Sequence, residues 1–91
     1  LVGHVGDGNF HFGYLIDPND PAERAKAEVL NQTMVERALR LGGTCTGEHG
    51  IGAGKIDSLL EEAGEPSVAV MKSIKAALDP NGILNPGKIF R

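Results

Sequence analysis

The pattern of apolar and polar positions predicts a strand hairpin at the start of the chain. Residues 1–5 and 9–16 form two short, largely apolar runs. The segment between them, at 6–8, is Gly-Asp-Gly, a sequence typical of tight turns. The two runs are therefore expected to pair as short strands across this turn.

A first helix is predicted to follow the hairpin. Asp20 and Pro21 form a helix start, because aspartate caps free backbone N–H groups and proline suits the first helical position. A glycine pair at 42–43 is expected to end this helix. Between these points the apolar residues form a stripe suited to burial, made of Val29, Leu30, Met34, Val35, Ala38, Leu39 and Leu41.

The second half of the chain predicts a short helix at 56–63 and a longer one from Pro66 that ends before Pro80. The longer helix has its own apolar stripe, made of Val70, Met71, Ile74, Ala77 and Leu78. A turn at 79–82 and a tail at 83–91 complete the chain. Two short strands with two to three helices make the expected fold class α+β.

Composition narrows the functional classes. A chain of 91 residues is expected to form one domain at most, with a marginal core. One cysteine excludes an internal disulfide scaffold, and a net charge of −3 gives no basic surface for nucleic acid. No signal or transmembrane segment is apparent, so we expect a cytoplasmic, membrane-associated or mitochondrial protein. The start at Leu1 suggests a segment of a longer protein.

Glycine and histidine gather in the same two places. Ten of the 13 glycines, and all three histidines, lie within 3–13 and 42–54. Glycine permits sharp turns and close approach to a ligand, while histidine binds metals and transfers protons near neutral pH. The residues that could bind a metal or transfer a proton are therefore expected in these two segments.

In the first segment, His4 and His11 flank the predicted turn and are expected to face one another across the hairpin. Two such imidazoles can chelate a divalent cation, with a further ligand supplied from elsewhere. The alternative is that each histidine is an ordinary hydrogen-bonded residue.

In the second segment, Glu48 and His49 place a carboxylate beside an imidazole. Adjacent side chains project in different directions, so Glu48 is expected to complete the metal site while His49 acts as a general base. The alternative is a solvated Glu-His pair in a glycine-rich loop. A phosphate-binding loop is excluded, because His49 stands where that motif needs glycine and Ile56 where it needs Ser or Thr.

The combination resembles the C-terminal part of the FAD-linked oxidases of the vanillyl-alcohol-oxidase superfamily, a group with D-lactate dehydrogenases, glycolate oxidases and D-2-hydroxyglutarate dehydrogenases. The Thr44-Cys45-Thr46 run looks most like the cytochrome-linked D-lactate dehydrogenases. Three stretches carry the resemblance: Gly3-His4-Val5-Gly6-Asp7-Gly8-Asn9-Phe10-His11, Thr44-Cys45-Thr46-Gly47-Glu48-His49-Gly50-Ile51-Gly52 and Leu78-Asp79-Pro80-Asn81-Gly82-Ile83-Leu84-Asn85-Pro86-Gly87-Lys88.

The resemblance implies a role for five residues. His4, His11 and Glu48 match the family's ligands for a divalent metal, zinc or manganese. His49 matches the residue proposed to take the substrate's hydroxyl proton, and Asn85 matches a position near the FAD.

The resemblance also implies the setting of these residues. Residues 1–91 would be the C-terminal segment of an FAD-linked oxidase, comprising part of a ferredoxin-like substrate (cap) domain and the tail. The FAD-binding domain would lie outside them, so the segment alone is not expected to be active.

The expected function is oxidation of a D-2-hydroxy acid, first of all D-lactate, to the 2-oxo acid. The expected partners are an electron acceptor such as cytochrome c or a quinone, and further copies of the chain in a homo-oligomer. The alternative is a non-enzymatic α+β module for metal binding or oligomerisation that uses the same motifs.

Overall fold

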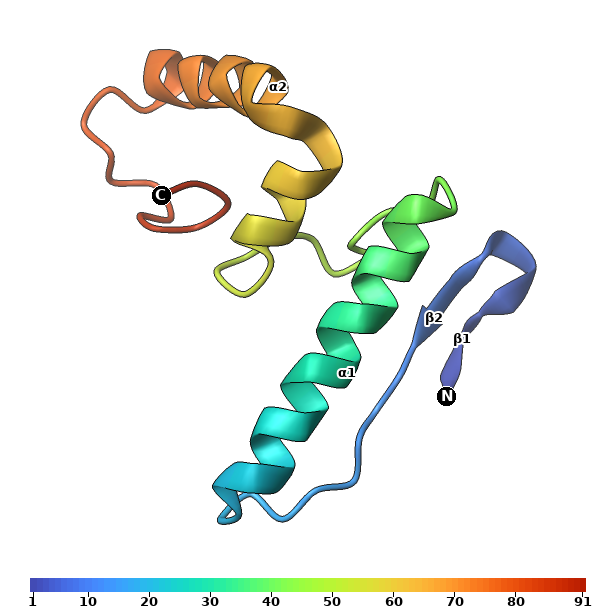
Figure 1. Ribbon diagram of the computed structural model, residues 1–91. Coiled ribbons are helices and arrows are strands. Elements are labelled where there is room, and N and C mark those ends of the chain that lie inside the picture. Colours follow the sequence, from blue (N-terminus) through green and yellow to red (C-terminus); the bar gives the residue numbers. More distant parts are fainter. The chain divides into compact units, whose positions relative to one another are not determined.

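The computed structural model describes residues 1–91, which separate into two compact units, Leu1–Glu48 and His49–Arg91. The structure contains two short strands and two long helices, which confirms the α+β class (Figure 1). The elements of the first unit are β1 (Val2–His4), a 3₁₀ turn (Val5–Asp7), β2 (Asn9–His11) and α1 (Pro21–Arg40). The second unit contains α2 (Ile56–Leu78).

The hairpin forms as the sequence predicts, with β1 and β2 antiparallel. Gly8 closes the turn in the left-handed region, at φ 72°, and its N–H donates to the carbonyl of Val5 at 3.0 Å. Gly3 lets the strands approach closely, because a Cβ built there would lie 2.5 Å from the carbonyl oxygen of Asn9 and from the Cα of Phe10. Two glycines thus fix the turn and the spacing of the hairpin.

The second strand is shorter than predicted. The sequence predicts a strand over 9–16, whereas β2 ends at His11. The pairing of Val2 with His11 is the last of the ladder, so residues beyond His11 have no partner strand. Phe12, Leu15 and Ile16 are instead exposed.

Both ends of α1 follow the predicted signals. The Asp20 side chain accepts hydrogen bonds from the backbone N–H groups of Ala22 and Glu23, at 2.8 and 3.3 Å. At the other end, Gly42 is left-handed at φ 80°, and the N–H of Gly43 donates to the carbonyl of Ala38 at 2.8 Å. This is a Schellman motif, in which glycine relieves the backbone strain that any other residue would carry.

The core is smaller than the apolar stripes predict. Val35 and Cys45 are the only buried apolar residues, and no side chain is fully buried. Val29, Leu30 and Leu41 were expected to be buried but are 65%, 55% and 78% exposed. The stripe on α1 is therefore covered only where the hairpin and the loop after α1 reach it.

A kink divides α2 into the two helices that the sequence predicts. Gly64 has φ 77° and ψ 157°, which is not helical and is open almost only to glycine. Pro66 follows within the same element, where its ring would clash with a preceding carbonyl if the helix were continuous. Gly64 and Pro66 together thus explain the break.

The apolar stripe of α2 is also largely exposed. Val70, Ile74 and Leu78 are 61%, 57% and 78% exposed. Neither helix is long and apolar enough to cross a membrane.

Candidate functional site

Three polar side chains share one face of the hairpin. In the ladder, His4 lies opposite Asn9, and Val2 lies opposite His11. Directly paired residues point to the same side, and so do residues two apart along a strand. His4, Asn9 and His11 therefore project from the same face.

His4 and His11 share this face of the hairpin, but they are not a directly opposed pair of the ladder. The 3₁₀ turn Val5–Asp7 with Gly8 sets the register, so that Asn9, not His11, is the direct partner of His4. His4 and His11 are instead diagonal neighbours on their shared face. The sequence did place two imidazoles on one hairpin, but the register could only be read from the structure.

Glu48 joins this face from the other end of the first unit. Helix α1 carries the chain back along the hairpin (Figure 1). Glu48 lies in the loop after α1 and is the last residue of the first unit. The Oε1 atom of Glu48 lies 2.8 Å from Nε2 of His11, and its Oε2 lies 4.0 Å from Nε2 of His4. The Nδ2 group of Asn9 donates to Oε2 at 2.5 Å. Glu48 follows His11 by 37 residues and Asn9 by 39, so the cluster joins segments that are far apart in the sequence.

The donor set of this cluster fits a divalent cation. Two imidazole nitrogens and one carboxylate oxygen are ligands that zinc accepts, each at about 2.0–2.2 Å from the metal. Ligand atoms at such distances from one ion lie roughly 3–4 Å from each other, close to the 2.8 and 4.0 Å found here. The side chains of His4, Glu48 and His11 are 70%, 44% and 32% exposed, so the cluster is open to solvent and to a ligand.

Asn9 is the member of this cluster that sequence reasoning missed. A period of two counted back from His11 along β2 would have placed Asn9 on the same face. A pocket of about 300 Å³ lies beside it, between the hairpin, α1 and the loop after α1. Its lining includes Asn9, Val35, Thr46 and Gly47.

His49 follows Glu48 directly and is the first residue of the second unit. It is exposed and lies in the glycine-rich loop before α2. Gly50 continues the chain in the left-handed region, at φ 78°. An exposed imidazole next to Glu48 in the chain is accessible to a substrate.

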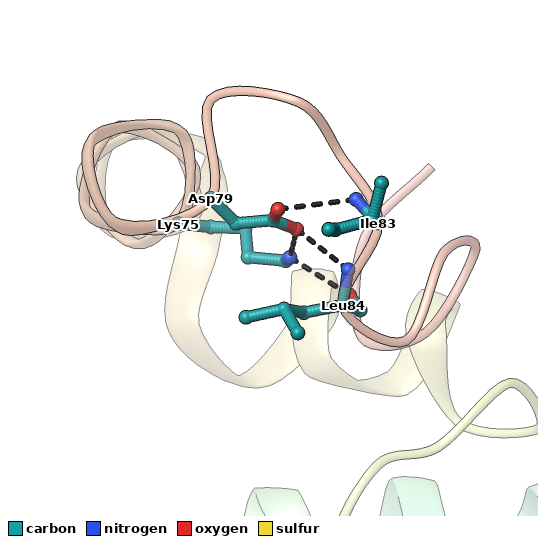
Figure 2. A network of polar contacts seen from close by, with 4 residues as sticks. All are labelled: Lys75, Asp79, Ile83 and Leu84. Carbon is teal, nitrogen blue, oxygen red and sulfur yellow. Dashed lines mark hydrogen bonds and ion pairs between the residues drawn. The ribbon is translucent and has the colours of Figure 1, made fainter.

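A second polar network lies at the end of α2 (Figure 2). The carboxylate of Asp79, which is only 7% exposed, accepts the backbone N–H groups of Ile83 and Leu84 at 3.0 Å each. Lys75, one helical turn earlier, donates to the same carboxylate and to the carbonyl of Leu84. The hydrogen bond from Lys75 and those from the two backbone N–H groups hold the pKa of Asp79 below its ordinary value, against an opposing effect of desolvation.

This network fixes the segment that leads to Asn85. Asn85 follows Leu84 directly and is exposed, with its backbone in the left-handed region at φ 46°. The Asp79 carboxylate and Lys75 thus hold the two residues just before Asn85, while Asn85 itself is exposed. The sequence predicted Asp79 only as part of a turn, because nothing in the chain marks its partners.

Comparison with known proteins identifies the family. Residues 1–89 match the model of the FAD linked oxidases, C-terminal domain. This chain belongs to that family. It is 57% identical, over its whole length, to a mitochondrial D-lactate dehydrogenase [cytochrome] of Kluyveromyces lactis. It is 51% identical over 99% of its length to a probable mitochondrial D-lactate dehydrogenase of Danio rerio.

A glycolate oxidase subunit is also similar. The chain is 44% identical, over 96% of its length, to subunit GlcD of glycolate oxidase from Escherichia coli (strain K12). The chain spans 15%, 18% and 17% of the lengths of these three relatives. The family is that of an FAD-linked oxidoreductase, and the roles of individual residues stay predictions.

Proposed function

We propose that this chain forms the metal-binding and substrate-binding C-terminal part of an FAD-dependent dehydrogenase. The whole enzyme would oxidise a D-2-hydroxy acid, first of all D-lactate, to the 2-oxo acid. The observation that carries the proposal is the cluster of two imidazoles and one carboxylate on the hairpin, in a chain of the FAD-linked oxidase family. The names of the relatives support lactate or glycolate as the kind of substrate.

In this proposal His4, His11 and Glu48 hold one divalent cation, zinc or manganese. When bound, such a cation supplies Lewis-acid polarisation of the substrate's hydroxyl and carboxylate groups. The chain contributes the orientation of the ligands: the two strands hold both imidazoles on one face, and the loop after α1 holds the carboxylate against them.

His49 is proposed as the general base. A neutral imidazole nitrogen of His49 would accept the proton of the substrate's hydroxyl group. The FAD, when bound, would supply the hydride acceptor. Glu48 and His49 thus divide the work: the carboxylate binds the cation, and the next side chain takes the proton. The exposure of His49 supports this assignment, because the base must reach a bound substrate.

Asn85 is proposed to contact the FAD through its exposed carboxamide. The clamp of Asp79 and Lys75 holds the backbone that leads to it, so little ordering is left to occur on binding. The FAD-binding domain itself would lie outside residues 1–91.

Three further properties of the whole enzyme belong to the proposal. Its electron acceptor would be cytochrome c or a quinone, and its location a mitochondrial one, following the names of several relatives. The exposed apolar side chains of both helices support association with further copies of the chain or with other parts of the enzyme.

The test is anaerobic reduction of the flavin in the full-length enzyme, followed by absorbance after mixing with D-lactate, L-lactate or glycolate. We expect D-lactate to reduce the flavin fastest, and His49→Asn to slow that step by roughly 10²–10⁴-fold. Metal content should stay unchanged in this variant, because in this proposal His49 is assigned as the base and not as a ligand. Equally fast reduction in His49→Asn, or loss of its metal, would contradict the assigned roles.

A further inference from the structure

We infer that Asn9 is a positioning residue that orients the carboxylate of Glu48, and that Gly47 is the residue that keeps Asn9 in place. The inference rests on the proposed function of Glu48 as a metal ligand and adds two residues to that site. Neither contributes a ligand atom of its own.

The hydrogen bonds of Glu48 show why Asn9 matters. Its two carboxylate oxygens have different partners: Oε1 lies 2.8 Å from Nε2 of His11, and Oε2 accepts the amide N–H of Asn9 at 2.5 Å. A carboxylate held at both oxygens has a fixed plane. Glu48 is otherwise exposed, and an exposed glutamate without such partners samples several rotamers.

The orientation of the Asn9 amide follows from its surroundings. An ionised carboxylate offers only acceptors, so the NH₂ group of Asn9 must face Glu48. The amide oxygen Oδ1 then points the other way, where it is buried and has no hydrogen-bond partner. A buried amide oxygen left without a partner has a cost, which indicates that the arrangement is kept for what the NH₂ group does.

Gly47 forms the wall behind this amide oxygen. A Cβ atom built on Gly47 would approach Oδ1 of Asn9 well inside 3.0 Å, a separation that real Cβ atoms essentially never show. The absence of a side chain at position 47 therefore makes the room that the Asn9 amide fills. The amide is held between two consecutive residues of one loop, with Gly47 behind it and Glu48 in front.

The expected consequence is stronger metal binding. Hydrogen-bond partners of ligating groups orient the ligands, and their loss typically weakens metal affinity by about 10–100-fold. Asn9→Ala removes the donor directly. Gly47→Ala displaces it, because the new methyl group occupies the space of Oδ1.

The experiment measures Zn²⁺ and Mn²⁺ affinity of the full-length, flavin-loaded enzyme after removal of its metal. We expect Asn9→Ala and Gly47→Ala each to raise the dissociation constant by about 10–100-fold. The double variant should bind no more weakly than Asn9→Ala alone, because the amide that the new methyl group at position 47 would displace is already gone. Gly6→Ala in the same hairpin is the matched control, since its added Cβ meets nothing within 4 Å.

The outcomes separate the two levels of the account. If the unmodified enzyme binds neither metal, the proposed function of the cluster fails. If it binds metal but Asn9→Ala leaves the affinity unchanged, or if the two single effects multiply in the double variant, the positioning role alone is overturned. Should Gly47→Ala fail to fold, recovery of a folded protein in the double variant supports the contact, and failure of both to fold opposes it.

Discussion

The kink at Gly64 gives a prediction whose size can be worked out from the backbone. Replacement by alanine adds one methyl group, and the only atom near the new Cβ is Cδ of Pro66 at 3.8 Å, an ordinary contact. The perturbation is therefore one of backbone strain alone. At φ 77° and ψ 157° an L-residue carries a cost of about 1–3 kcal/mol.

Two effects could reduce this cost, and only the first of them does. Alanine loses less conformational freedom than glycine on folding, which returns about 0.4–1 kcal/mol. Straightening of α2 would relieve the strain, but Pro66 makes a continuous helix unfavourable by about 3 kcal/mol. The kink should therefore persist, and Gly64→Ala should destabilise α2 by about 1–2 kcal/mol.

Hydrogen exchange followed by mass spectrometry measures this effect locally. Amides of α2 should exchange about 5–30-fold faster in Gly64→Ala than in the unmodified protein. Gly54→Ala is the control, because Gly54 has open space around it and no positive φ. Exchange in Gly64→Ala as slow as in Gly54→Ala would show that the kink carries no strain for other residues.

Two further predictions concern the residues that hold the sites. Asp79→Asn should flatten the acid dependence of the free energy of unfolding. The native pKa of Asp79 is lowered, mainly by its hydrogen bond from Lys75. The contribution of Asp79 to stability is therefore complete above the ordinary pKa of 3.8 and is lost as the pH falls through the native pKa. If the acid unfolding curves of Asp79→Asn and of the unmodified protein coincide, this prediction is refuted. Gly3→Ala should open the hairpin, because the added Cβ would collide with the backbone of Asn9 and Phe10. Metal titration should then show weakened binding, and an unchanged metal affinity would contradict this prediction.

Local signals explain which parts of the fold were predictable from the sequence. Asp20 and Pro21 set the start of α1 through side-chain and backbone geometry that needs no distant partner. Gly64 and Pro66 likewise break α2 where the pattern predicts two helices. Strand length and burial were less predictable, because they depend on which segment lies alongside, as the exposed Leu15 after β2 illustrates.

In the candidate site, too, residues marked by local sequence were predictable, and contacts between distant segments were not. His4 and His11 were recognised from their glycine-rich surroundings, and Glu48 from its neighbour His49. The direct pairing of His4 with Asn9 depends on the register that the turn sets, and the contact of Asn9 with Gly47 joins segments far apart in the sequence. Neither leaves a local signal.

The most direct test of the central claim is the metal content of the full-length, flavin-loaded enzyme, measured by elemental analysis with and without Glu48→Gln. This change keeps the size of the side chain but removes the negative charge with which Glu48 would bind a cation. We predict one divalent cation per flavin in the unmodified enzyme, and its loss from a variant whose circular dichroism is unchanged. An equal metal content in both proteins would contradict the claim, and loss of metal together with loss of the fold would favour a structural site instead.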